Sequence, residues 1–240
     1  MDSRIGKAGF FTAAVIGAAA FASVDASAQA IFAPTDGPGV IGGRSDGTSF
    51  LVGAVGVDGG NNVYTDNVWP AAESPDHIID GFGQKYLNFA ELNTGVIVTP
   101  AFNGGGGSVA RSLKFWTAND TPGRDPVTYQ LLGTNNTITG AGPFPLSNFT
   151  LISSGTLSLP ASRNAGGTTA PLDDANSQLV SFANSTSYKT YMLLVPTIKD
   201  EPTVNSMQVA EIQLFTTVPE PSCFAVAGVG GLLLASRRRR

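Results

Sequence analysis

The stretch SVARSLKFWT, residues 108–117, carries the pattern that predicts the fold. From Leu113 to Thr117 apolar and polar side chains alternate, which is the period of a strand with one buried face. Six further stretches show such alternation or an excess of β-branched residues: 49–57, 95–99, 128–133, 149–158, 188–196 and 209–216. No stretch keeps a helical apolar period over three turns. Many short strands separated by turn residues predict an all-β fold, a β-sandwich of jelly-roll type.

The composition suits an extracellular all-β domain. Charged residues make up 13% of the chain, where about a quarter is usual for globular domains. The only cysteine is Cys223, close to the C-terminus, so the body of the chain has no disulfide. Such a body must be stabilised by a large core or by a bound metal. We expect one domain over residues 29–217, because a length of about 190 residues suits a single core.

The first 28 residues have the order of parts of a secretory signal peptide. Arg4 and Lys7 precede an alanine-rich apolar run over residues 8–22, and Ala26-Ser27-Ala28 provides the small residues that signal peptidase requires. The pattern predicts export and cleavage after Ala28. A buried N-terminal helix is the alternative, which the basic start and the alanine excess disfavour.

The last 23 residues combine a short proline motif, an apolar run over 224–235 and an arginine cluster. These parts are Pro219, Glu220 and Pro221, followed after the run by Arg237, Arg238, Arg239 and Arg240. A helix of that length rises about 18 Å, short of a hydrocarbon core of about 30 Å, so it is a marginal anchor. The arginines would hold its end in the cytoplasm.

This order of parts resembles the PEP-CTERM sorting signal of Gram-negative bacteria that make extracellular polysaccharide. The resemblance implies recognition by an exosortase, a membrane-embedded cysteine transpeptidase, with processing near the Pro-Glu-Pro motif. It also implies that the protein is anchored only transiently in the inner membrane. The final location would then be the cell surface or the extracellular matrix.

The charge of the body narrows the class of partner. Residues 29–217 hold eight of the 14 basic and 15 of the 18 acidic residues, which gives a net charge of −7. A field of that sign repels nucleic acid and anionic lipid headgroups. We therefore expect no nucleic-acid partner and favour glycans, cations or matrix proteins.

Three stretches in order along the chain resemble the discoidin, or coagulation-factor C-type, domains of galactose-binding-like fold. The first is SPDHIIDGFGQKYLNF at residues 74–89, the second covers residues 117–134, and the third is SMQVAEIQL at residues 206–214. Together they extend the resemblance over residues 61–216. It implies the same β-sandwich that the strand pattern predicts.

The first and the third of these stretches together suggest a structural calcium site. Ca²⁺ takes six to eight oxygen ligands, mixing carboxylates with backbone carbonyls of a bent loop. Asp80 and Glu211 would supply carboxylates and Ala210 a carbonyl, while the resemblance implies loop carbonyls from Gly83 and Lys85. Lys85 departs from the family pattern, where a threonine often stands, and one alternative is that its ammonium group replaces the ion by pairing with Asp80. The other alternative is that Asp80 only caps a turn and Glu211 is a solvated strand residue.

Two residues are candidates for contact with a ligand. Trp69 is flanked by Asn67 and Pro70, as in a loop, and could stack on a sugar, with a place in the core as the alternative. Arg124 could bind a sugar acid, or it could pair with Asp125 and hold a long loop in place. Residues 160–177 form a second polar loop that we expect to be long and mobile.

Nothing in the chain singles out a nucleophile. His77 is the sole histidine, and no Gly-x-Ser-x-Gly motif accompanies it. The aspartate pairs Asp120–Asp125 and Asp173–Asp174 could in principle flank a glycosidic bond, although vicinal aspartates on a polar loop are usually solvated. The sequence therefore favours a non-catalytic surface or matrix protein that binds extracellular polysaccharide. The alternatives are a purely structural surface protein and, third, a glycan hydrolase.

Overall fold

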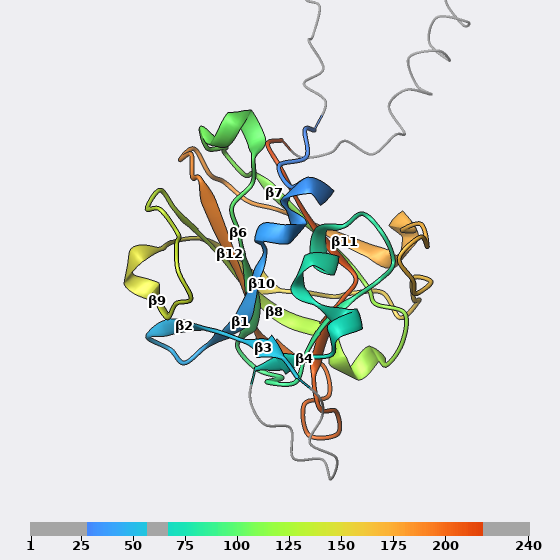
Figure 1. Cartoon of the computed structure of the whole chain (residues 1–240). Helices are drawn as coiled ribbons and strands as arrows, with labels where there is room; N and C mark the ends of the chain where they lie inside the picture. Colours follow the sequence, from blue (N-terminus) through green and yellow to red (C-terminus); the bar gives the residue numbers. More distant parts are fainter. Residues whose placement is uncertain (1–27, 57–66, 218–240) are drawn as a thin grey trace, which may run out of the picture.

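The computed structural model describes residues 28–56 and 67–217 (Figure 1). The strands of this part are β1 (Ile41–Ser45), β2 (Ser49–Val52), β3 (Ala54–Val55), β4 (Val68–Trp69), β5 (Tyr86–Asn88), β6 (Thr94–Val98), β7 (Ser112–Trp116), β8 (Pro126–Thr134), β9 (Phe144–Pro145), β10 (Thr150–Thr156), β11 (Ser177–Ser181), β12 (Thr190–Ile198), β13 (Met207–Val209) and β14 (Glu211–Phe215). Short 3-10 helices connect them: η1 (Pro34–Gly39), η2 (Ala71–Glu73), η3 (Pro75–Ile79), η4 (Phe102–Gly105), η5 (Pro122–Arg124), η6 (Leu146–Asn148) and η7 (Asp174–Asn176).

Two antiparallel sheets form a β-sandwich, so the predicted all-β fold is confirmed. The larger sheet has seven strands in the order β10-β8-β12-β6-β1-β2-β9, and the smaller has three in the order β11-β7-β14. Side chains from both sheets meet in one core, with Leu113 and Ile212 from the small sheet and Val96 and Leu193 from the large one. Apolar burial between the sheets is the main stabilising term of such a fold.

The central strands β6 and β12 of the large sheet are buried on both faces, which explains their continuous apolar residues. In β12, Tyr191 and Leu193 belong to the core between the sheets, while Met192 and Leu194 belong to a second cluster with Phe144. The other buried members of this second cluster are Phe50, Ile97, Leu132 and Phe149. A strand covered on both sides loses the alternation of a half-exposed strand.

All seven predicted strand stretches contain strands of the structure. The stretch at 108–117 holds β7, and the stretch at 49–57 is divided into β2 and β3. β1 was not predicted, because its sequence IGGRS offers two glycines in place of an apolar alternation. β11 was not predicted either, since its residues SQLVS fall within and beside the expected polar loop.

One small strand pair brings the predicted calcium ligands toward each other. β5 pairs antiparallel with β13, with Tyr86 opposite Val209 and Asn88 opposite Met207. In an antiparallel pair, the residues before one strand lie beside those after the other. The loop that ends at β5 therefore meets the first residues of β14.

The two ends of the chain fall outside this description. The predicted signal peptide, apart from Ala28, and the predicted sorting signal at residues 218–240 lie outside the described residues. Within the described residues, no helix has the length and apolar character needed to cross a membrane.

Candidate functional site

Glu211 and the loop that carries Asp80 lie side by side. The backbone N–H of Gly81 donates a hydrogen bond to Oε2 of Glu211 at 3.1 Å. Gly81 has φ of +83°, a conformation that glycine adopts without strain, and this turns its amide toward the closing strand. Sequence reasoning placed Asp80 and Glu211 in one site, and the structure brings their segments together.

Glu211 is a buried carboxyl group without a basic partner. Its side chain is 3% exposed, so the alternative of a solvated strand residue is wrong. Burial, to which the nearby charge of Asp80 adds, raises the pKa of Glu211 to about 9 against the opposing backbone hydrogen bonds of the loop. In the part of the chain that the structure describes, no lysine, arginine or histidine forms a salt bridge with it.

Asp80 is held by its own loop. Its Oδ1 accepts a hydrogen bond from the backbone N–H of Phe82 at 2.8 Å, the local turn that the alternative interpretation predicted. Its Oδ2 lies 2.7 Å from Nδ1 of His77. His77, which the sequence left without a role, is therefore the residue that orients this carboxylate.

Gly83 and Ala210 lie next to the contact between Glu211 and the loop that carries Asp80, which we call the junction. The N–H of Gly83 donates to the carbonyl of Ala170 at 2.8 Å, and a Cβ at Gly83 would lie 1.9 Å from the carbonyl oxygen of Ala165. Ala210 is fully buried and donates its N–H to the carbonyl of Trp116. Both positions need a small residue in a tightly packed backbone.

Lys85 does not pair with Asp80. The alternative in which its ammonium group takes the place of a calcium ion is therefore wrong. Its side chain is 6% exposed, and its Nζ lies 2.7 Å from Asp120 and 3.4 Å from Glu73. The ammonium group points to a different pair of carboxylates because the two segments that carry them close over it. This leaves Asp80 and Glu211 without a lysine between them.

Asp80 and Glu211 are the two carboxylates that would be available to a cation at this junction. The described residues hold no group of three or more histidine, cysteine, aspartate or glutamate side chains around one point. A cation here would be held by Asp80 and Glu211, with carbonyls of the loop and of Ala210 as further ligands, which is a set that Ca²⁺ accepts. The buried, uncompensated carboxyl group of Glu211 fits such an ion.

The expectation that Trp69 stacks on a sugar is corrected. Trp69 is 7% exposed and belongs to the main core. Its ring meets that of Tyr86 edge to face, with ring centroids 5.9 Å apart. The residue lies in β4, which pairs parallel with β3, so the segment predicted to be a loop is a short strand.

The pairing of Arg124 with Asp125 is also corrected. Asp125, 2% exposed, binds Arg163 through two parallel hydrogen bonds of 2.7 and 2.8 Å. Burial raises the pKa of Asp125 although the Arg163 guanidinium opposes the shift. Arg124 instead donates from Nη2 to Oδ1 of Asn205 at 2.7 Å and is half-buried.

The same contact fixes the second polar loop, which was expected to be mobile. Arg163 belongs to this loop, and so does Asn164, which is buried and donates to the carbonyl of Thr117. The loop is thus anchored on the end of the sandwich at several points.

The four aspartates considered for glycoside hydrolysis each have a structural partner. Asp120 binds Lys85 and Asp125 binds Arg163. Asp173 caps η7 by accepting the N–H of Ala175, and Asp174 pairs with Lys114 at 2.6 Å. None of these contacts sets two carboxyl groups facing each other across a cleft.

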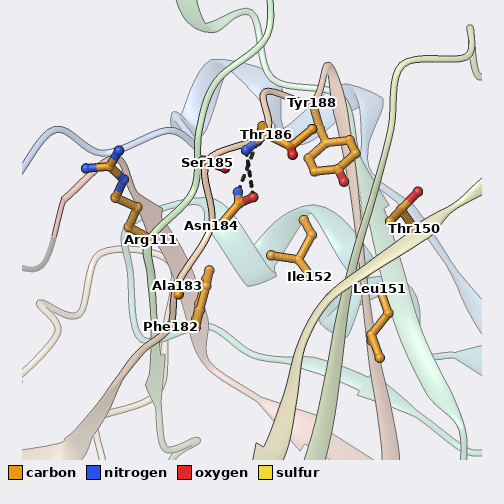
Figure 2. A pocket seen from close by; sticks show the side chains of 10 residues that line it. All are labelled: Arg111, Thr150, Leu151, Ile152, Phe182, Ala183, Asn184, Ser185, Thr186 and Tyr188. Carbon is orange, nitrogen blue, oxygen red and sulfur yellow. Dashed lines mark hydrogen bonds between the residues drawn. The ribbon is translucent and has the colours of Figure 1, made fainter.

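One recess of the described surface is a groove that the sequence did not indicate. It has a volume of about 600 Å³ and lies between β10 and the loop that leads into β12 (Figure 2). Both β10 and β11 are edge strands of their sheets, so the groove follows the open side of the sandwich. Its lining consists of Arg111, Thr150, Leu151, Ile152, Phe182, Ala183, Asn184, Ser185, Thr186 and Tyr188.

One wall of the groove is held in a fixed shape by Asn184. Its Nδ2 donates to the carbonyls of Ala110 and Thr186, and its Oδ1 accepts the N–H of Thr186 at 2.9 Å (Figure 2). The amide is fully occupied by the protein. Ser185 and Thr186 are therefore displayed on a rigid turn with their side chains exposed.

Tyr188 forms the aromatic part of the lining. Its backbone exchanges two hydrogen bonds of 2.9 Å with Ser108, and its ring packs over Gly133, where a Cβ would come within 2.4 Å of the Tyr188 Cγ. The ring is fixed further by an edge-to-face contact with Tyr191. Leu151, 55% exposed, adds an apolar surface on the opposite side.

No protein-family model matches this sequence, and no curated protein matches it. Solved structures similar to this chain include family 32 carbohydrate-binding modules. The module CpGH89CBM32-5 from Clostridium perfringens, in complex with GalNAc-β-1,3-galactose, has 12% identity and a TM-score of 0.45, covering 78% of this chain and 99% of its own. The module of NanJ from the same organism, in complex with galactose, has 11% identity and a TM-score of 0.44, covering 78% and 98%.

A third similar structure is the family 32 module of EndoD from Streptococcus pneumoniae. It has 8% identity and a TM-score of 0.42, covering 62% of this chain and 89% of that module. At these identities and TM-scores the similarity does not extend to a shared site or a shared function.

Proposed function

We propose that this chain is an exported, non-catalytic surface or matrix protein whose β-sandwich binds extracellular polysaccharide in the groove between β10 and residues 182–188. The observation that carries the proposal is the groove itself. It is a preformed recess of about 600 Å³, within the range of small-molecule sites in proteins.

The lining suits a sugar, which has apolar C–H faces and many hydroxyl groups. Leu151, Ile152 and Phe182 offer apolar surface at the groove, while Tyr188 is 8% exposed and belongs mainly to the core. Thr150, Ser185 and Thr186 offer exposed hydroxyl groups. A mixed lining of this kind binds amphipathic ligands with a few oriented hydrogen bonds.

The two ends of the sequence support a location at the cell surface or in the extracellular matrix. The basic and apolar start with Ala26-Ser27-Ala28 supports export. The Pro-Glu-Pro motif, the apolar run and the arginine cluster support sorting by an exosortase, followed by attachment to the cell surface or release into the matrix.

A calcium ion at Asp80 and Glu211 is the second part of the proposal. Calcium would neutralise the buried carboxyl group and tie the loop before β5 to β14, in a body without disulfides. The role assigned to it is structural, because the junction is formed by other residues than those that line the groove.

The function is tested by measuring binding of the purified full chain to immobilised β-galactan, dextran and alginate. We expect weak, saturable binding to at least one of them. Ser185→Trp places a large side chain on the exposed turn of the groove and should abolish that binding without affecting the melting temperature.

The matched control is Ser154→Trp, which adds the same side chain at an exposed position of β10 that does not line the groove. Equal loss of binding in both variants would contradict the location of the site. Absence of binding to every polysaccharide would contradict the function, and concentration-dependent self-association in that case would support the purely structural alternative.

A further inference from the structure

We propose that the groove selects an acidic saccharide, whose carboxylate binds the guanidinium group of Arg111. This inference rests on the proposed glycan-binding function and names the class of sugar that the same site takes. It depends on the charge of the lining, on the freedom of Arg111 and on the fixed position of its backbone.

The charge of the lining is positive. Of the ten residues that line the groove, Arg111 is the only one with a charged side chain. Several other basic side chains of the described part, Lys85, Lys114 and Arg163, are bound to carboxylates of the protein. The groove therefore offers a cation to a ligand and no competing acid.

The guanidinium group of Arg111 is free to bind. The residue is exposed, and among residues 28–56 and 67–217 its side chain has no hydrogen-bond or salt-bridge partner. In Figure 2 it extends clear of the other labelled side chains, at the end of the lining away from Thr150 and Leu151. A planar guanidinium group binds a carboxylate through two parallel hydrogen bonds.

The backbone of Arg111 is held on both sides. Its N–H donates to the carbonyl of Phe215 at 2.8 Å, and its carbonyl accepts the N–H of Phe182 at 3.0 Å. Because Phe182 itself lines the groove, the backbone of Arg111 has a fixed place relative to the apolar floor. Its exposed side chain can then reach the carboxylate of a saccharide whose ring lies on that floor.

The net negative charge of residues 29–217 disfavours an acidic ligand. A preference for the acidic form would therefore point to a local contact and not to the overall charge. The charge of −7 over residues 29–217 repels an acidic ligand, although screening limits that repulsion to about 8 Å at physiological salt. Any preference for the acidic form of a sugar must therefore come from the contact with Arg111. Removing that residue should reverse the preference.

The experiment compares one oligosaccharide in two charge states. An alginate hexasaccharide and the same hexasaccharide with its carboxyl groups reduced to alcohols are titrated into the purified full chain by calorimetry. We expect the acidic form to bind about tenfold more tightly. For Arg111→Gln the acidic form should bind no more tightly than the reduced form, while the affinity for the reduced form stays unchanged.

The matched control is Lys189→Gln, which removes one exposed positive charge near the groove from a residue that does not line it. It should keep the preference for the acidic form. Equal affinity of the wild-type chain for both forms would overturn the inference and leave the proposed function standing. Equal losses in Arg111→Gln and Lys189→Gln would also overturn it, and no binding of either form would contradict both proposals.

Discussion

The Oε2 atom of Glu211 accepts a hydrogen bond from the backbone N–H of Gly81, so two segments 130 positions apart share one buried contact. The backbone amide of Asp80 also interacts favourably with this carboxyl group, and both donors are neutral. Neutral donors do not fully compensate a buried charge. The stability of the protein should therefore respond to the protonation of Glu211 and to any cation that binds it.

Stability in the presence of a chelator should fall as pH rises. The folded state keeps the proton on Glu211 up to its pKa of about 9, while the unfolded chain releases it near the ordinary glutamate pKa of 4.5. Between these values the unfolded state binds fewer protons, so the free energy of unfolding decreases with rising pH. We expect Tm to fall by roughly 3 °C per pH unit between pH 5 and 9. In Glu211→Gln this slope should disappear, and a slope equal to that of the wild-type chain would contradict the assignment.

Calcium should raise Tm, and the rise should depend on Asp80. A ligand that binds only the folded state stabilises it in proportion to the logarithm of its concentration. Because the ion displaces the proton of Glu211, the effect should grow from pH 6 to pH 8. Asp80→Asn should remove most of the calcium-dependent rise. Asp76→Asn, at an exposed position of η3, is the control that should keep it, and loss of the calcium effect in both variants would argue against a specific site.

Removing Arg163 should be strongly destabilising. Its substitution by methionine leaves the carboxylate of Asp125 buried without its two hydrogen bonds, which costs about 3 to 5 kcal/mol when one partner of such a pair is lost. For a domain of this size that lowers Tm by about 10 °C. The double variant Arg163→Met with Asp125→Leu should recover much of the loss. Arg111→Met is the control with an exposed arginine, and a similar drop there would contradict the explanation.

Gly83→Ala should destabilise the loop on which the calcium proposal depends. The new methyl group would meet the carbonyl oxygen of Ala165, which is backbone and does not move aside easily. We expect a loss of about 1 to 3 kcal/mol, measured by urea denaturation. Gly39→Ala serves as control, because no heavy atom lies within 4 Å of the added group there. Equal stability of the two variants would show that the contact is not as tight as described.

The two ends of the chain should be absent from the secreted protein. Mass spectrometry of the exported material should give an N-terminus at Gln29 and a C-terminus near Glu220. A variant with Arg237 to Arg240 replaced by glutamine should be processed poorly, because it lacks the charges that hold the tail in the cytoplasm. A final product that keeps all four arginines would contradict sorting.

The sandwich could be predicted because most of its strands have a recognisable apolar pattern within their own residues. β7, β8, β12 and β14 carry alternating or continuous apolar residues, and burial follows directly from those patterns. β1 could not be found this way, since glycines at positions 42 and 43 pack closely on Pro75 and on the Leu51 carbonyl and leave no apolar signal. Short edge strands such as β9 have too few residues to show any period.

The site was predictable only where a resemblance joined distant segments. Asp80 and Glu211 were paired on that ground, whereas Asp125 was paired with its neighbour Arg124 because sequence adjacency was the only guide. Its actual partner, Arg163, lies 38 positions away in a loop whose position depends on the whole fold. The groove is built from three separate segments with no motif in common, so no local pattern could have indicated it.

The turn at residues 184–186 owes its shape to the amide of Asn184 and to backbone groups, and not to the side chains of Ser185 and Thr186. Those two positions can accept different side chains while the turn stays folded. If the groove binds the proposed ligand, recognition would be separated from stability, and a lineage that keeps Asn184 would be free to change its ligand by exchanging the two residues beside it.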